Sequence, residues 1–437
     1  MMSKNKNIEP YNHSYFIVLL LAVLPLVTSC DDIFGSKDDS TTEEIFEEGR
    51  QDPQAQEDVV GYAALVPFWE NFNEPTDVFA GFDELVYVTD ADGLTVLDES
   101  GRRFQTIPFD GAVAVTQDRL LNVYVAARID TVIDVIDPDV TWNLAAVYKI
   151  KNANGAGELS IVDTLIHPFM DDSRSTQAAQ LSRLVKGSET NDELVEITGL
   201  TILADNTLYV TRRGPLNNRT AIAAPDNTVL EFQPIVVDQE PTDKMRNVRQ
   251  IRSINPSTPS LISGIGMSDI TSFIGPPQRQ SMSDNRSFMI AQAFLETEIP
   301  FRVLQVIVRE TPDGLVFEPN TSLLSTDTTQ ANGFLMEQFR FGQPSGVAFA
   351  GDGSNNLFVV DALKDSLYQF QFNGQEGVTP PPGSNAEKPI IVSFGGTGAG
   401  PKQFSEPSGV AFFDEIVYVA DKGNNRIARY KLTTDFE

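Results

Sequence analysis

The stretch FGQPSGVAF, residues 341–349, recurs almost unchanged as FSEPSGVAF at residues 404–412. Each copy leads into a second apolar segment that ends in Asp, which is LFVVD at residues 357–361 and VYVAD at residues 417–421. A short unit of this kind cannot bury its own apolar faces, so copies of it stack against one another. The repeated stretch therefore predicts a repeat architecture built from short β-strands.

Four weaker copies of the two-strand pattern lie upstream. They join residues 75–78 to 86–90, 110–113 to 123–126, 197–200 to 208–211, and 267–270 to 288–291. The segments are rich in Val, Ile, Leu, Phe and Tyr, which favour strands that are buried on both faces. Gly or Asp at the start of the first strand suits a crowded axis, where a bulky side chain would clash. The chain is thus expected to contain six repeats of this pattern.

The last copy continues as KGNNRI, residues 422–427, and the whole unit resembles the NHL repeat, which forms a blade of β-propellers. The resemblance implies an all-β fold, a six-bladed NHL-like β-propeller over residues 59–437. Its specific motifs cover the last two blades, while the other four rest on the strand pattern alone.

Ring closure needs one more strand, because the last repeat ends after its third strand, residues 426–432. The apolar stretch at residues 59–68 is the candidate for the missing fourth strand. An N-terminal strand in this place would close the last blade and remove an exposed sheet edge. The alternative is that residues 59–68 form a disordered stub.

Cys30, the single cysteine, follows an apolar segment at residues 16–27 that Lys4 and Lys6 precede. The sequence VTSC at residues 27–30 resembles the lipobox of bacterial lipoproteins. The resemblance implies that residues 1–29 are a signal peptide and that Cys30 is lipidated as the first residue of the mature chain. The apolar segment is shorter than the roughly 20 residues of a spanning helix. The alternative is a buried core helix with an incidental cysteine.

Residues 30–58 are acidic and poor in apolar side chains, which predicts a flexible tether between the anchor and the propeller. Acidic residues directly after the lipidated cysteine resemble an export signal of surface lipoproteins. This implies a lipid-anchored location at the outer membrane, with exposure at the cell surface. In other bacterial groups an Asp at this place favours the inner membrane, so the alternative stays open. The membrane is the first expected partner, through the lipid on Cys30.

The formal net charge of −29 argues against nucleic acid as a partner, because nucleic acid binding depends on neutralising phosphates with cations. With Cys30 lipidated, no disulfide can form, so the core and the strand pairing must supply the stability. A glycan or an outer-membrane protein is the expected second partner.

Propeller ligands generally meet the face built by the loops that follow the second strands. The residues just after these strands are Asp90, Ala127, Arg212, Gln292, Asp361 and Asp421. Arg128, Arg213 and Arg219 add positive charge on one side of this ring. Such a patch suits an acidic sugar or another carboxylate. The alternative is that these arginines form ordinary surface ion pairs.

The insert at residues 170–196 is expected to lie over the same face, between the second and third blades, with a short helical lid around residues 177–184. Loops of this length are either functional or disordered, and the sequence leaves both readings open. The insert at residues 275–284 is expected on the opposite face.

Enzymatic function is the weaker hypothesis. Some NHL propellers are lyases with a histidine-bound metal, but the mature chain has one histidine, His167, expected at the surface or at a strand end. One imidazole cannot build a His-rich zinc site, so no catalytic and no metal-binding residue is assigned. No cofactor is expected, with a calcium-assisted lactonase or hydrolase as the alternative, because calcium needs only oxygen ligands. The sequence thus favours a membrane-anchored, extracytoplasmic binding or scaffold module for a glycan or protein.

Overall fold

The structure is a computed structural model that describes residues 60–217, 225–251, 264–274, 286–293, 299–324, 333–384, 386 and 388–436. Cys30, the signal peptide and the tether lie outside the described residues, as do Arg219 and the insert at residues 275–284. None of the described helices is both long and apolar enough to cross a bilayer.

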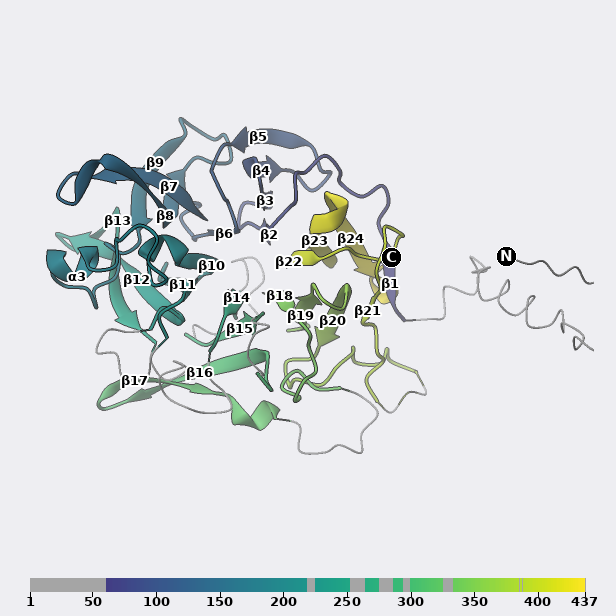
Figure 1. Ribbon diagram of the computed structural model, residues 1–437. Coiled ribbons are helices and arrows are strands. Elements are labelled where there is room, and N and C mark those ends of the chain that lie inside the picture. Colours follow the sequence, from purple (N-terminus) through teal and green to yellow (C-terminus); the bar gives the residue numbers. More distant parts are fainter. Residues whose placement is uncertain are drawn as a thin grey trace, which may run out of the picture. The chain divides into compact units, whose positions relative to one another are not determined.

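Six four-stranded antiparallel sheets form the blades of a ring (Figure 1). Blade 1 contains β2 (Asp77–Ala80), β3 (Val86–Asp90), β4 (Gly93–Leu97) and β5 (Arg103–Ile107). Blade 2 contains β6 (Ala114–Gln117), β7 (Val123–Ile133), β8 (Asp137–Lys151) and β9 (Ser160–Ile166). Blade 3 contains β10 (Glu196–Ile202), β11 (Leu208–Arg213), β12 (Thr228–Val237) and β13 (Glu240–Gln250).

Blade 4 contains β14 (Met267–Ser272), β15 (Phe288–Gln292), β16 (Val303–Thr311) and β17 (Gly314–Pro319). Blade 5 contains β18 (Pro344–Phe349), β19 (Leu357–Asp361), β20 (Ser366–Phe370) and β21 (Phe394–Gly395). Blade 6 contains β22 (Pro407–Phe413), β23 (Ile416–Asp421), β24 (Arg426–Leu432) and β1 (Tyr62–Ala64). The described helices are α3 (Gln177–Leu181) and the 3₁₀ turns η3 (Asp192–Leu194), η5 (Thr321–Leu323), η6 (Lys422–Asn424) and η7 (Thr433–Asp435). The predicted all-β, six-bladed β-propeller is confirmed.

The N-terminal strand β1 closes the ring, as predicted. It pairs antiparallel with β24, with Tyr62 opposite Leu432 and Ala64 opposite Tyr430. The Tyr62 hydroxyl also donates a 2.6 Å hydrogen bond to Gln369 Oε1 in blade 5. Because β1 covers the outer edge of β24, the two ends of the propeller sequence lie in one sheet and that edge is not left open.

Hydroxyl groups at the start of the inner strands tie blades 4, 5 and 6 to the blades that follow them. Ser268 donates to Pro344 O, Ser345 to Pro407 O, and Ser408 to Pro75 O, at 2.5 to 2.7 Å. A glycine follows the serine in blades 5 and 6, where the neighbouring blade is close. A Cβ on Gly409 would lie 2.7 Å from Asp77 Oδ1, and a Cβ on Gly346 would lie 2.8 Å from the Cα of Gly409. The PSG motif of blades 5 and 6 is therefore a blade-to-blade joint.

Apolar contacts between blades form the core. The second strands β3, β15 and β19 are buried along their whole length. Aromatic rings fill the gaps between sheets, as where Phe358 of blade 5 stacks on Phe412 of blade 6 with ring centroids 5.3 Å apart. Burial on both faces explains why these strands are continuous apolar runs rather than alternating ones.

Candidate functional site at the channel mouth

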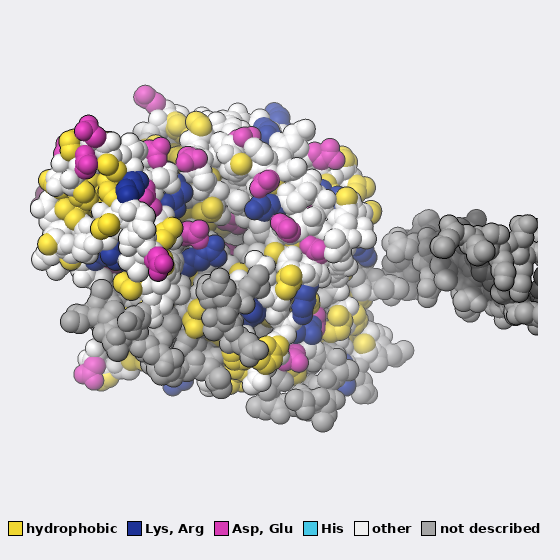
Figure 2. Space-filling view, in the orientation of Figure 1, with side chains coloured by type: hydrophobic (Ala, Val, Ile, Leu, Met, Phe, Trp, Pro, Cys, Tyr) yellow, Lys and Arg dark blue, Asp and Glu magenta, His cyan; other side chains and the backbone are white. Residues whose placement is uncertain are grey.

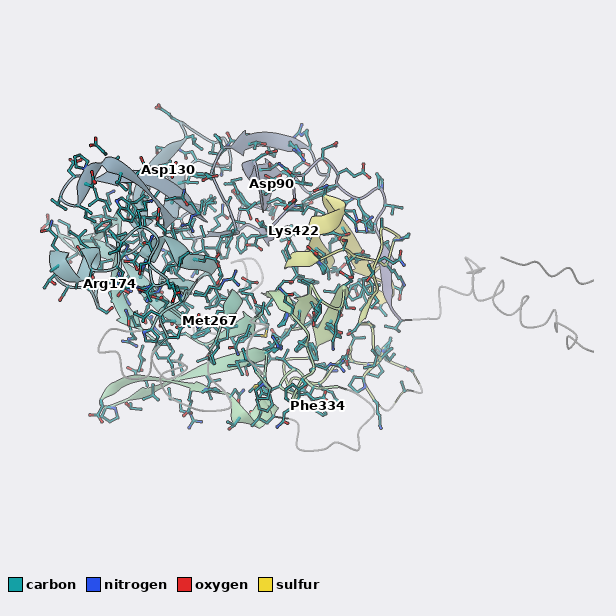
Figure 3. All side chains as sticks on the ribbon, in the orientation of Figure 1. Asp90, Asp130, Arg174, Met267, Phe334 and Lys422 are labelled. Atoms are coloured by element: carbon teal, nitrogen blue, oxygen red, sulfur yellow. The ribbon has the colours of Figure 1, made fainter. Side chains whose placement is uncertain are left out.

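A hollow of about 360 Å³ opens at one mouth of the central channel. Its wall includes the hydroxyl residues that precede or begin the inner strands, together with four charged side chains. The hydroxyl residues are Thr76, Thr198, Ser268, Ser345 and Ser408, and the charged ones are Arg128, Glu196, Arg213 and Lys422. Figure 3 labels Lys422 at the inner end of blade 6, beside the central opening. This mouth lies on the face that the sequence predicted, because the residues after several second strands line it.

Arg128 brings a positive charge that its hydrogen-bond partners do not cancel. Its guanidinium donates to the backbone oxygens of Asn143 and Glu193, both at 2.7 Å, and to the side-chain oxygen of Asn143. All of these acceptors are neutral, and the side chain is half-buried. The geometry fixes the cation at the mouth and leaves its field directed at the hollow.

The other two cations are held more loosely. Arg213 pairs with Glu196 at 2.5 Å, and both side chains are substantially exposed. Lys422 Nζ lies 3.8 Å from Glu74 Oε2, at the outer limit of an ion pair. The charged side chains that line the mouth are thus three cations and one carboxylate, in a chain with a net charge of −29. An anionic group could replace Glu196 as the partner of Arg213.

The five hydroxyl residues of the wall, which we call the hydroxyl ring, surround the mouth. Two carboxyl groups, those of Asp77 and Asp269, lie deeper in the channel. They belong to blades 1 and 4, on opposite sides of the channel, and line a second, smaller chamber of about 90 Å³. Asp77 accepts hydrogen bonds from the N–H groups of Val78 and Val115, and Asp269 accepts from Ile270 and Val347, at 2.7 to 3.0 Å. Each aspartate therefore links its own blade to the next one.

Burial raises the pKa of Asp77 to about 7, and the two backbone hydrogen bonds only partly oppose this effect. The pKa of Asp269 is raised well above its usual value by burial and by the charge of Asp77. Both side chains retain some accessible surface because they face the narrow channel, but they lie deep inside the ring. The channel floor consequently carries less negative charge near neutral pH than two ordinary carboxylates would.

Five of the candidate ligand residues are buried and serve the fold instead. Asp90, Arg212, Gln292, Asp361 and Asp421 are at most 2% exposed. Asp361 accepts hydrogen bonds from the N–H groups of residues 342, 343, 363 and 364, and Asp421 accepts from Ser405 N and Arg426 Nε. A carboxylate at the end of the second strand thus fastens the loops around it. These five side chains do not face the mouth.

Three of the charged residues that line the mouth come one position after the last residue of the predicted inner pair of strands. Arg128, Arg213 and Lys422 come directly after Ala127, Arg212 and Asp421. Successive residues of a strand point to opposite sides, so a shift of one position exchanges a buried side chain for an accessible one. Of the candidate residues, the structure brings Arg128 and Arg213 together at the mouth. Lys422, Glu196 and the hydroxyl ring were missed, although the Ser before each PSG glycine is a signal in the sequence.

A buried network of ion pairs, which we call the latch cluster, fastens the insert at residues 170–196 to blades 2 and 3. It consists of His167, Asp171, Arg174, Arg183, Asp192, Arg212 and Asp226. Arg174 contacts both oxygens of Asp192 at 2.6 and 2.9 Å, and Arg212 contacts Asp171 at 2.5 Å. The insert contains the short helix α3, at the place predicted for a helical lid. The latch cluster gives it a fixed position between the blades.

Burial would raise the pKa of Asp171 and of Asp192, but the neighbouring arginines, with His167 beside Asp192, lower both to about 2. His167 directly follows β9, at a strand end as one of the two expected positions, but it is fully buried, which corrects the expectation of a surface position. Burial lowers its pKa to about 4, against the opposing effect of its 3.0 Å contact with Asp192. His167 is therefore a neutral member of the latch cluster near neutral pH.

Metal binding was the alternative reading of the channel. Among the described residues, no three His, Cys, Asp or Glu side chains are grouped so that they could hold a metal ion. The channel offers the two carboxyls of Asp77 and Asp269, whose oxygens already accept backbone hydrogen bonds. The calcium hypothesis stays a prediction that binding measurements can test.

Comparison with known proteins supports the repeat assignment. Residues 404–430 match the model of the NHL repeat. The last blade is therefore similar to an NHL repeat. The NHL blade spans the three strands β22, β23 and β24, to which β1 adds the fourth. A search of curated proteins found no match to the chain.

Solved structures with a similar arrangement share little sequence with this chain. A Bacteroides thetaiotaomicron protein of unknown function is 16% identical, with a TM-score of 0.44, over 86% of this chain and 76% of that one. An auxiliary nutrient binding protein of the same bacterium is 11% identical, with a TM-score of 0.45, over 83% and 70%. Virginiamycin B lyase from Staphylococcus aureus is 12% identical, with a TM-score of 0.39, over 86% and 100%.

Proposed function

We propose that this protein is a lipid-anchored, extracytoplasmic binding module that holds a carboxylate-bearing glycan at the channel mouth. The observation that carries the proposal is the excess of cations around a hollow of about 360 Å³. That volume lies in the range of small-molecule sites. The five hydroxyl residues of the wall suit a sugar, while Arg213 and Lys422 suit its carboxylate.

The test compares a uronic acid oligosaccharide with a neutral one of the same length by isothermal titration calorimetry. The acidic sugar is expected to bind, and Arg213→Ala to weaken its binding at least about tenfold, because a charge-assisted hydrogen bond contributes roughly 1.5–3 kcal/mol. Arg309→Ala is the matched control, since Arg309 forms a similarly exposed pair with Glu318 at 2.6 Å on β16 and β17. Equal binding of both sugars, or equal loss in both variants, would contradict the proposal.

The anchor belongs to the same proposal. Lipidation of Cys30 would attach the propeller to a membrane, because two or three acyl chains give durable attachment without a spanning helix. The acidic residues that follow Cys30 favour the outer membrane. Cys30→Ser should move the protein from the membrane fraction to the soluble fraction and abolish labelling with a palmitate analogue. An unchanged distribution would show that the membrane is reached in another way.

The calcium-assisted hydrolase is tested with the same protein. We expect millimolar calcium to leave the thermal midpoint unchanged, because Asp77 and Asp269 already accept backbone hydrogen bonds and hold raised pKa values. A ligand that binds only the folded state raises the midpoint by mass action. A clear rise with calcium would therefore favour the enzymatic reading over the glycan-binding one.

A further inference from the structure

The β7–β8 hairpin extends beyond its blade. β7 pairs with β8 from Val123 to Ile133, but with β6 only over residues 123–126. β8 pairs with β9 only from Ala146 onward. Within the part of the chain that the structure describes, residues 127–133 of β7 and 137–145 of β8 therefore have only each other as strand partners. They form a two-stranded ribbon that reaches roughly 15 Å past the sheet, at about 3.3 Å per residue.

One side of the ribbon is covered by the insert. Trp142 and Leu144 of β8 pack in one apolar cluster with Leu184. Lys186 Nζ lies 4.5 Å from the Trp142 ring and donates a 2.8 Å hydrogen bond to Thr141 O. The latch cluster fixes the insert, so the ribbon stands on a rigid support.

The tip of the ribbon is apolar and exposed. Val132, Val135 and Ile136 are 46%, 66% and 36% exposed. The turn is closed by a 2.9 Å hydrogen bond from Ile136 N to Ile133 O. Solvent-facing turns are usually built from Gly, Asn, Asp, Ser and Pro, whose conformations or side chains suit the turn. Adjacent exposed aliphatic side chains at such a place are typical of a contact surface.

Carboxylates surround the apolar tip. Asp130, Asp134, Asp137 and Asp139 lie on the hairpin, and no Lys or Arg occurs between residues 129 and 148. Figure 2 shows apolar and acidic side chains together at the end of the molecule where Figure 1 draws this hairpin, and Figure 3 labels Asp130 there. A partner that covers this tip must supply positive charge beside apolar groups, because uncompensated carboxylates at an interface are costly.

The ribbon also has an open edge. Arg128 N donates a 2.9 Å hydrogen bond to Asp110 O, and beyond Arg128 the strand β7 has β8 as its only strand partner within the described ranges. The alternation of a strand places the N–H of Val132 on the same edge as that of Arg128. Such an edge is a template for an additional strand from another chain.

We propose that the β7–β8 hairpin docks an extended segment of a partner protein, which adds to β7 as a strand and carries Lys or Arg beside apolar side chains. Hydrogen bonds between the backbone of β7 and the backbone of the segment align the segment along the strand. Val132, Val135 and Ile136 receive its apolar side chains, and the four aspartates receive its cations. The proposal is independent of the glycan site at the channel mouth.

The probe is a fluorescent eight-residue peptide of alternating Lys and Val, compared with an alternating Glu and Val peptide, in fluorescence polarisation with the full chain at 50 mM salt. We expect the basic peptide to bind and the acidic one not to bind. Val135→Ser with Ile136→Ser should weaken binding at least tenfold. The matched control is Val236→Ser with Val237→Ser at the tip of the β12–β13 hairpin, where the two valines are 61% and 54% exposed.

A second pair of variants tests strand addition. Val132→Pro removes one N–H from the open edge and should abolish binding, whereas Val132→Thr should keep most of it, with circular dichroism to verify the fold of both. Absence of binding by the parent chain would overturn the proposal, as would equal loss at both hairpin tips. Self-association of the parent chain that disappears in the Val135→Ser, Ile136→Ser variant would also overturn it, in favour of a second copy as the occupant.

Discussion

Asp192 shows how a single buried charge can hold a long insert. Its carboxylate accepts hydrogen bonds from Arg174 and contacts His167, and its side chain has no exposed surface. The cluster connects residues far apart in the sequence, since Arg183 also reaches Asp226 at 2.7 Å. Charges buried in this way are stable only as a complete set, because each partner compensates the desolvation of the others.

Replacement of Asp192 by Ala should therefore lower the free energy of unfolding by about 3–5 kcal/mol, because Arg174 is left buried without its anion. Urea denaturation measures the loss. The control is Glu318→Ala, which removes an ion pair that is 40–67% exposed and should cost less than about 1 kcal/mol. Similar losses in the two variants would show that the latch cluster contributes no more than a surface pair.

Arg212 and Arg213 show what residue type alone could not decide. The first is fully buried against Asp171, and the second pairs with Glu196 beside the hollow. Two of the arginines that the sequence singled out, Arg128 and Arg213, line the mouth. It did not separate the inward from the outward side chain, because that depends on strand register.

At the scale of elements, β1 decides whether the NHL blade is complete. Three residues of β1 pair with β24, and Tyr62 adds a hydrogen bond to blade 5. Without β1, the outer edge of β24 would offer unpaired backbone groups to other chains. The strand is short, yet it joins blade 6 to the sequence that precedes blade 1.

Deletion of residues 60–65 should lower the thermal midpoint and produce larger species in size-exclusion chromatography, because the β24 edge becomes accessible. Tyr62→Phe is the comparison, since it removes only the hydroxyl that bonds Gln369 and should cost about 1 kcal/mol without association. A deletion variant that melts and elutes like the parent chain would show that β1 is dispensable for closure.

The insert at residues 170–196 illustrates the limits of an element-scale prediction. Its composition fits a loop, and only the helix α3 could be anticipated from the sequence. Its order comes from Arg212, Asp226 and Trp142, which lie outside the insert, in blades 2 and 3. A local pattern cannot reveal partners that are supplied by neighbouring blades.

At the scale of the whole molecule, two groups of buried charges act on stability in opposite pH ranges. The raised pKa of Asp77 means that the folded state keeps a proton that the unfolded state loses, so stability falls as the pH rises from about 4 to about 7. The lowered pKa values of Asp171 and Asp192 stabilise the fold above about pH 4, and this contribution is lost toward pH 2. His167 adds a loss between about pH 6.5 and 4.

We therefore compare the thermal midpoint of the Asp77→Asn variant with that of the parent chain at each pH. The difference should shift in favour of the variant by at least about 2 °C as the pH rises from 5 to 8. Differential scanning calorimetry at several pH values measures the difference. Asp134→Asn, at the exposed hairpin tip, should shift the midpoint by the same amount at every pH in this range. A difference for Asp77→Asn that stays constant would mean that the aspartate does not titrate there.

The sequence by itself determined the number of blades and the closure of the ring by β1. The blades share a pair of apolar strands, of which the second is buried, so their number is visible along the chain. The closure by β1 is visible because the last repeat lacks a fourth strand of its own. Only the tertiary structure decided which side chains form the mouth and the latch cluster. Arg128, Arg213 and Lys422 come from blades 2, 3 and 6, and they meet because the ring closes, which no local stretch of sequence encodes.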